Sequence, residues 1–319
     1  MKKILISFTG LAAAAGLAFF GLDYSDVRPL LDAVFSDKAG SGVASEASGK
    51  ISSESADKSR KAGDAEVNAR KLELPAALKG IKERIVEHTG FTLSFNSAYN
   101  NPNWVAWELS SDETEGNGNR GDEFFPDPEI PEPHRVTSDD YRGSGYDRGH
   151  MCPAADMKWS PAAMHDCFYM SNICPQTHAL NSGGWQVLER ACRRWARQEG
   201  RIYIVCGPVY GRAGGAAEVR GMAEKGAPRT ASSRKPKMIG SEHSVAVPDG
   251  FFKCVMSLKD GEEKAIAFYY TNRTSQQTMD SAVCSVDDIE ALTGMDFFVN
   301  VDSRLEKRIE AVYSLKDWR

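Results

Sequence analysis

The feature that most constrains the fold is one amphipathic segment followed directly by an apolar one. Residues 182–199 carry apolar side chains at helical spacing, and Gly200 ends the pattern. The apolar face holds Trp185, Leu188, Cys192 and Trp195. Residues 201–206 are then apolar and rich in β-branched side chains, and Gly207-Pro208 follows them. We therefore expect a helix that covers a sheet, with residues 201–206 as a central strand.

The remaining patterns predict a mixed domain in which most strands run antiparallel. Strands are expected over residues 104–109, 168–170, 251–258 and 264–270. The second of these would deliver Asn172, and the last two would form a hairpin. Short helices are expected after Ser160-Pro161 and from the capping box at Ser285 to Gly294. The predicted fold class is α+β, with a mainly antiparallel central sheet flanked by helices.

The residues best suited to chemistry lie in Asp147-Arg148-Gly149-His150 and downstream of it. The downstream candidates are Asn172, Asn181 and Glu189. Histidine is the natural general base at neutral pH. An Asn amide oxygen, together with a Glu bonded to metal-bound water, suits Mg²⁺, which prefers oxygen ligands and keeps several waters. A base, a cation, an oxygen ligand and a second acid are the parts needed to hydrolyse a phosphodiester with one hard metal ion.

These motifs resemble those of a known family, the DNA/RNA non-specific endonucleases of the ββα-metal class, which includes mitochondrial endonuclease G. The resemblance rests on Asp147-Arg148-Gly149-His150, on Ser171-Asn172-Ile173-x-Pro175-Gln176, and on Asn181-x-x-x-Trp185-x-x-x-Glu189. It extends through residues 204–208 to residues 293–298 and so covers most of residues 72–319. The resemblance implies the ββα-metal nuclease fold and hydrolysis of DNA and RNA to 5′-phosphate and 3′-hydroxyl ends.

The resemblance also implies a role for each motif residue. His150 would be the general base, and Asn181 would be the direct protein ligand of Mg²⁺, with Mn²⁺ as a substitute ion. Glu189 would hold metal-bound water, and Asn172 would help to fix the site. The family motif includes Asp147 and Arg148, whose individual roles it leaves open. The family also contacts phosphate through an upstream arginine, for which Arg120 is the candidate here, alongside Arg148.

Several alternatives stay open from the residues alone. Asn181 could be only the N-cap of its helix, and the arginines of residues 190–197 could be a solvated face or a phosphate-tracking surface. A zinc site at His150, Cys152, Cys174 and His178 is disfavoured because no paired Cys-x-x-Cys spacing is present. A non-catalytic nucleic-acid-binding or uptake protein is the main alternative function. A phosphodiesterase for small or lipid substrates is another, although the net charge of +8 over residues 185–240 favours a polyanion.

The N-terminal residues predict export from a bacterial cytoplasm. Lys2-Lys3 precede an apolar run over residues 4–22, so residues 1–22 are expected to be a signal peptide or a membrane anchor. Residues 23–71 are poor in aromatic side chains and read as a flexible linker, which leaves residues 72–319 as the nuclease domain. The domain would then be periplasmic, secreted or tethered outside the cytoplasm. In such an oxidising compartment some of the seven cysteines are expected to pair, with Cys254–Cys284 as the candidate bridge.

Overall fold

The computed structural model describes residues 71–81, 83–116, 121, 123–211, 214–224, 235–274 and 277–319. The predicted signal or anchor over residues 1–22, the predicted linker except Lys71, and Arg120 lie outside these residues. No helix in the described ranges has the length and apolar character needed to span a bilayer.

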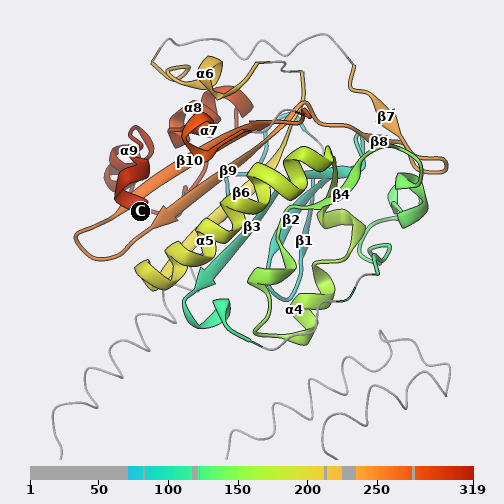
Figure 1. Ribbon diagram of the computed structural model, residues 1–319, viewed down its shortest axis with the longest axis horizontal. Helices are drawn as coiled ribbons and strands as arrows, with labels where there is room; N and C mark the ends of the chain where they lie inside the picture. Colours follow the sequence, from blue (N-terminus) through green and yellow to red (C-terminus); the bar gives the residue numbers. More distant parts are fainter. Residues whose placement is uncertain are drawn as a thin grey trace, which may run out of the picture. The chain divides into compact units, whose positions relative to one another are not determined.

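Seven strands of the described chain form one sheet in the order β1-β2-β3-β6-β9-β10-β11, and each neighbouring pair is antiparallel (Figure 1). Their bounds are β1 (Arg84–Glu87), β2 (Thr92–Asn96), β3 (Asn101–Ser110), β6 (Arg201–Val209), β9 (Gly250–Ser257), β10 (Lys264–Thr271) and β11 (Val283–Cys284). The middle strand is β6, and it is buried on both faces from Ile202 to Val209. That burial explains an apolar run without alternation and confirms the predicted central strand. The predicted hairpin is confirmed as β9 and β10.

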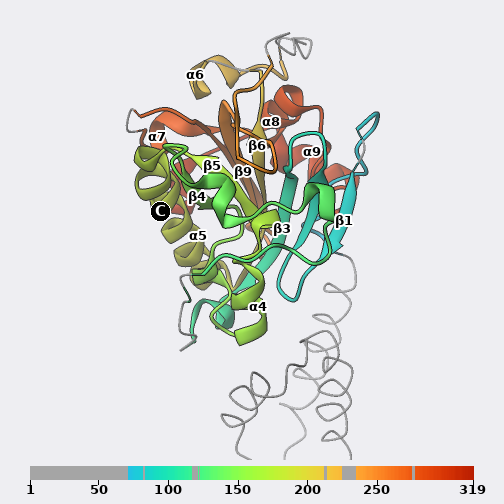
Figure 2. The ribbon, with the colours of Figure 1, turned by 90° about the vertical axis from the view of Figure 1, so that its right-hand side faces the viewer.

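Helices cover both faces of this sheet (Figure 2). On one face lies α5 (Gln186–Glu199), which buries Leu188, Cys192 and Trp195 against side chains of the strands. The opposite face is covered by α6 (Ala216–Val219), α8 (Val286–Thr293) and α9 (Ser303–Glu310). Two further α-helices of the described residues are α4 (Pro161–Asp166) and α7 (Met279–Ala282). The predicted α+β class with a mainly antiparallel sheet is confirmed.

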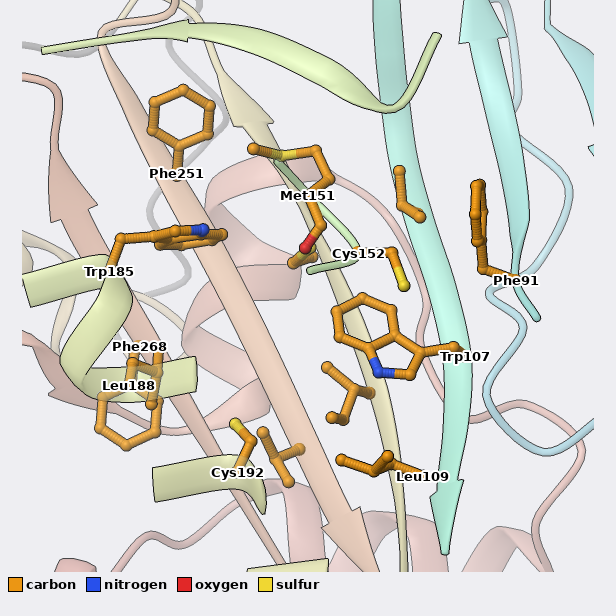
Figure 3. Close-up of a cluster of buried hydrophobic side chains, with 14 of the residues drawn as sticks. Phe91, Trp107, Leu109, Met151, Cys152, Trp185, Leu188, Cys192, Phe251 and Phe268 are labelled. Carbon is orange, nitrogen blue, oxygen red and sulfur yellow. The ribbon is translucent and has the colours of Figure 1, made fainter. Parts of the chain in front are cut away.

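The core under α5 contains two tryptophans from distant parts of the sequence. Trp107 of β3 and Trp185 at the start of α5 both reach into it (Figure 3). The ammonium of Lys253 on β9, a fully buried side chain, lies 4.8 Å from the ring centre of Trp107 and 4.5 Å from that of Trp185. A cation over two indole faces is stabilised by the ring quadrupoles. This packing fixes the start of α5 against the sheet, next to the predicted motif residues.

The predicted helix over residues 182–199 begins earlier and differently from the expectation. Residues Leu180–Trp185 form a π-helical turn with non-helical torsions at Gly183, and regular α-helix starts at Gln186. Gly200, with φ of 81°, ends the helix as predicted. The apolar periodicity located the helix but could not show the widened turn, which depends on tertiary contacts.

The strand predicted over residues 168–170 is wrong. After α4, the amides of Phe168 and Tyr169 donate to the carbonyls of His165 and Asp166, so the chain keeps turning. Tyr169 forms a single parallel bridge with Phe125. The apolar composition here serves burial of Phe168 in the core rather than a ladder. The strand that follows Asn172 is β5 (Ile173–Gln176).

The predicted bridge between Cys254 and Cys284 is also wrong, and all seven cysteines are free and buried. Both cysteines are register partners of Ala267 on β10, Cys254 from β9 and Cys284 from β11. Two strand spacings of about 4.8 Å separate them. A disulfide needs Cα atoms within about 7 Å, so this pair cannot close.

Candidate active site

The motif Asp147-Arg148-Gly149-His150 is strand β4 (Asp147–His150), which pairs antiparallel with β5. In this two-stranded sheet, Asp147 lies opposite Gln176 and His150 lies opposite Ile173. Side chains alternate along a strand, so Arg148 and His150 share one face. Both contact the ring of Phe124, Arg148 at 4.8 Å and His150 at 5.4 Å between centres.

Asn172 locks the chain immediately after His150. It is fully buried, and its side-chain oxygen accepts from the amide of Cys152 at 2.9 Å. Its side-chain nitrogen donates to the carbonyls of Cys152 and Cys167, both at 2.9 Å. Trp185 adds a fourth tie by donating from its indole to the carbonyl of His150 at 3.1 Å. Asn172 therefore holds backbone and does not reach the solvent side of the motif.

Replacing Asn172 with alanine should lower the free energy of unfolding by about 3 kcal/mol or more. The change orphans buried backbone groups of Cys152 and Cys167, each at a cost of about 1–3 kcal/mol. Urea unfolding measures the loss, and exposed Asn300→Ala, which removes one bond to the Lys71 carbonyl, is the matched control. Unchanged stability together with lost activity would instead give Asn172 a direct part in the reaction.

Gly149 is required by the close approach of Gln176. A Cβ atom built at Gly149 would lie 2.2 Å from the side-chain oxygen of Gln176 and 2.3 Å from its Cδ. Gln176 is fully buried, so its side chain has no open space into which to turn. The glycine of the motif thus lets β4 and β5 pack with this amide between them.

Gly149→Ala should destabilise the protein by about 1–3 kcal/mol, the usual cost of overpacking a core. Activity should fall as well, because the shift moves His150, the next residue. The double variant Gly149→Ala/Gln176→Ala should recover most of the lost stability. Gly215→Ala is the control, since Gly215 has φ of −93° and open space at its Cβ position. Equal thermal unfolding temperatures for Gly149→Ala and Gly215→Ala would refute this account.

Asp147 and Asn181 meet across the site. The side-chain nitrogen of Asn181 donates to Asp147 Oδ2 at 3.0 Å, and His178 Nδ1 lies 2.9 Å from the same oxygen. Asn181 therefore bonds to a side chain of β4 and does not cap its helix, since the described turn shows no side-chain cap. The bond assigns nitrogen to the atom facing Asp147, which leaves the amide oxygen of Asn181 for another ligand.

A cleft of about 620 Å³ opens beside these residues. It is lined by Phe124, Ser138, Asp139, Tyr141, Arg142, Gly143, Tyr146, Asp147, Arg148 and Asn181. Arg142 bonds to Asp139 at 2.6 Å, whereas Arg148 donates to the neutral hydroxyl of Ser138. Among the described residues, the Arg148 guanidinium is thus bonded to no carboxylate and can accept an anionic ligand.

His150 lies behind this cleft and does not line it. Its side chain is buried, with Phe124 on one side and Phe168 on another, at 5.4 and 5.1 Å between ring centres. Phe124 is half-buried and lines the cleft, so the imidazole packs against one of the residues that form the cleft wall.

Glu189 lies half-buried on the flank of α5, near a cluster of buried charges. Asp156 in this cluster is fully buried and forms an ion pair with Arg193 at 2.7 Å. Burial alone would lower the pKa of Lys253, but neighbouring acidic groups raise it: Cys206, Cys192, Glu189 and Asp156. Lys253 therefore stays charged and places a cation near Glu189. Because Arg193 belongs to this cluster, it is not part of a surface formed by the other arginines of residues 190–197.

The sequence of this chain matches the model of one protein family. The model of the family described as DNA/RNA non-specific endonuclease matches residues 70–304. This chain belongs to that family. The mitochondrial Nuclease 1 of Schizosaccharomyces pombe is 32% identical over 238 residues, which are 72% of this chain and 70% of the yeast protein. The mitochondrial Nuclease EXOG of Danio rerio is 34% identical over 217 residues, 66% of this chain but only 60% of the fish protein.

A solved structure confirms the fold of this endonuclease-family chain. The crystal structure of the EndoG/EndoGI complex, which addresses the mechanism of EndoG inhibition, matches with a TM-score of 0.63 and 24% identity. The match covers 75% of this chain and 93% of the other. The ββα-metal nuclease fold predicted from the motifs is therefore confirmed.

The zinc alternative does not fit this nuclease. Cys152 and Cys174 are fully buried, whereas the His178 side chain is 80% exposed and bonded to Asp147. In the chain as described, the His/Cys/Asp/Glu group close enough to hold a metal consists of Asp287, Glu290 and Glu310, and it shares no residue with the zinc proposal.

Two residues of the site were not predicted as parts of it. Phe124 contacts Arg148 and His150, yet in the sequence it is only one aromatic residue of a loop rich in proline and acids. The sequence suggests His178 only as a zinc ligand, although its place three residues before Asn181 puts both on the same turn. That spacing was the available signal for His178, and no comparable signal exists for Phe124.

Proposed function

We propose that this chain is a Mg²⁺-dependent endonuclease that hydrolyses phosphodiester bonds of both DNA and RNA to 5′-phosphate and 3′-hydroxyl ends. The observation that carries the proposal is the cleft that joins Asp147, Arg148 and Asn181, with His150 on the same strand. Membership of the endonuclease family supports the reaction class. The openness of a cleft built on a short strand at the surface favours a long polymer over a small enclosed substrate.

The donors in the cleft fit a hard metal ion. The amide oxygen of Asn181 and the carboxylate of Asp147 are oxygen ligands, and both residues line the cleft. Asn181 would hold Mg²⁺ directly, and Glu189 would hold its waters from α5. When bound, Mg²⁺ supplies positive charge that stabilises the pentacovalent phosphorus and the departing 3′ oxygen.

The protein side chains supply the remaining chemistry. Arg148 would bind a non-bridging phosphate oxygen, because its charge is directed into the cleft. His150 would take the proton from the attacking water. The hydrogen bond from the Trp185 indole to the backbone carbonyl of His150 would hold His150 in position. Arg120 remains the proposed upstream phosphate contact.

The test uses supercoiled plasmid and total RNA as substrates for the purified full chain. With Mg²⁺ both should be cleaved at internal bonds, and EDTA should stop cleavage. End-labelling after phosphatase treatment distinguishes 5′-phosphate from 5′-hydroxyl products. If the protein shifts both nucleic acids on a gel but cleaves neither with Mg²⁺ or Mn²⁺, it is a nucleic-acid-binding protein on a nuclease fold.

We further propose that residues 1–22 export the domain and that residues 23–71 tether it. Lys2-Lys3 and the apolar run over residues 4–22 support this proposal. Cell fractionation locates the protein, and N-terminal sequencing of the mature form separates a cleaved signal from a retained anchor. Accumulation of the intact chain in the cytoplasm would refute export.

A further inference from the structure

A second group of acidic side chains lies far from the motif in the fold. Asp287 and Glu290 are on α8 and Glu310 ends α9, and each offers a carboxylate oxygen within 4.8 Å of the others. Both helices pack on the sheet face opposite α5 (Figure 2). The group is therefore separated from Asn181 and His150 by the sheet itself, and no step proposed for phosphodiester hydrolysis uses it.

Glu310 is the most informative member of this group. Its side chain is only 4% exposed, and among the described residues its Oε1 atom is buried without a hydrogen-bond partner. A buried carboxylate without a partner is costly unless a proton or a cation neutralises it. Among the described residues, a cation bound between the three carboxylates would supply the partner that this buried oxygen lacks.

The surroundings of Glu310 are negative rather than compensating. The carboxylate of Glu290 accepts a hydrogen bond from the amide of Phe297 at 2.7 Å, which is a neutral donor. Asp296 and Glu306 add further negative charge beside the cluster. Lys307 lowers the pKa of Glu306, but the shift of that carboxyl remains upward because burial and Asp296 outweigh it. Within the described part of the chain, an ion pair therefore does not explain the gathering of these acids.

We propose that Asp287, Glu290 and Glu310 form a Ca²⁺ site that clamps α8 to α9 on the far face of the sheet. Three converging carboxylates offer only oxygen, which suits a hard cation and disfavours zinc or copper. Mg²⁺ usually takes one or two carboxylates and keeps its waters, whereas Ca²⁺ accepts several carboxylates in flexible geometry.

The position of the cluster explains what the ion would do. Apart from Glu310, α9 buries only Ile309 fully, so little apolar surface holds this helix to the sheet. A cation shared by Glu310 and the two acids of α8 would add a direct link between the helices. Because Ca²⁺ would bind the folded state and not the unfolded state, it would raise the stability of the protein by mass action.

The experiment measures thermal unfolding of the full chain in EGTA and in millimolar CaCl₂, with isothermal titration of Ca²⁺ alongside. Wild type and the exposed control Asp260→Asn should gain about 5 °C or more with Ca²⁺. Glu310→Gln and the milder Asp287→Asn should lose most of this gain and bind Ca²⁺ at least tenfold more weakly. All four proteins should keep Mg²⁺-dependent nuclease activity at a temperature where they are folded.

Three results would overturn the proposal. The first is no Ca²⁺-dependent gain in wild type. The second is a gain that Glu310→Gln retains, because the ion would then bind elsewhere, for example at Asn181. The third is a Glu310→Gln protein that is more stable than wild type in EGTA and in CaCl₂ alike. That result would mean that Glu310 is simply a protonated buried acid.

Discussion

Replacing His150 with alanine should lower kcat for plasmid cleavage by about 10²–10⁴-fold, the range for loss of a general base. The reason is local: His150 is the imidazole on the face of β4 that also carries Arg148, next to the cleft. Substrate binding should change little, because Arg148 and Asn181 still line the cleft. Cleavage rates at saturating substrate, together with gel-shift affinity in EDTA, separate these two effects.

The control for this variant is His165→Ala. His165 stacks on Phe125 with 4.9 Å between ring centres, and half of its side chain is exposed. Removing it should leave cleavage within a factor of a few of wild type. Added imidazole should restore part of the activity of His150→Ala, since a small base can enter the space left between Phe124 and Phe168. If His150→Ala loses affinity in proportion to its rate, His150 supports the binding surface and another group takes the proton.

The sheet could be predicted from the sequence where its signals are local. The helix α5 has a helical apolar period, β6 is a continuous apolar run, and Gly200 separates them, so the sequence locates both. The β9–β10 hairpin was found for the same reason. Residues 168–170 have the composition of a strand, but the turn hydrogen bonds that follow α4 decide their conformation. Composition reports burial there, and burial alone does not distinguish a strand from a turn.

The sequence proposes the residues of the candidate site, but it does not give their geometry. Strand β4 brings Asp147 to Asn181 through the pairing of β4 with β5, a contact between residues 34 positions apart. Phe124 joins the site only because its loop packs on β4, and no local pattern reports that packing. The four-residue motif likewise does not reveal that His150 packs between the rings of Phe124 and Phe168. Such features arise from tertiary packing, which single-sequence patterns do not encode.

Replacing Asn181 with alanine should lower cleavage at about 1 mM Mg²⁺ by about 10³-fold, comparable with loss of a group that stabilises transition-state charge. The variant removes the amide oxygen proposed to bind the ion and also the bond to Asp147 Oδ2. The Mg²⁺ concentration that gives half-maximal activity should rise as well. The measurement is the cleavage rate over a Mg²⁺ titration, with Asn300→Ala as a control for the substitution itself.

His178→Ala separates the two roles that Asn181 could have. Like Asn181, His178 bonds to Asp147 Oδ2, but its side chain is largely exposed and is not proposed to bind the ion. If Asn181 acts only by holding Asp147, then His178→Ala should reduce activity to a similar degree, and neither variant should change the Mg²⁺ requirement. If Asn181 is the metal ligand, only Asn181→Ala shifts the titration, and His178→Ala stays within about tenfold of wild type. Asn181→Asp gives a further comparison. The variant keeps an oxygen ligand, but it replaces the hydrogen bond to Asp147 with repulsion between two carboxylates. Its activity should therefore lie between those of wild type and Asn181→Ala, with a Mg²⁺ requirement nearer that of wild type.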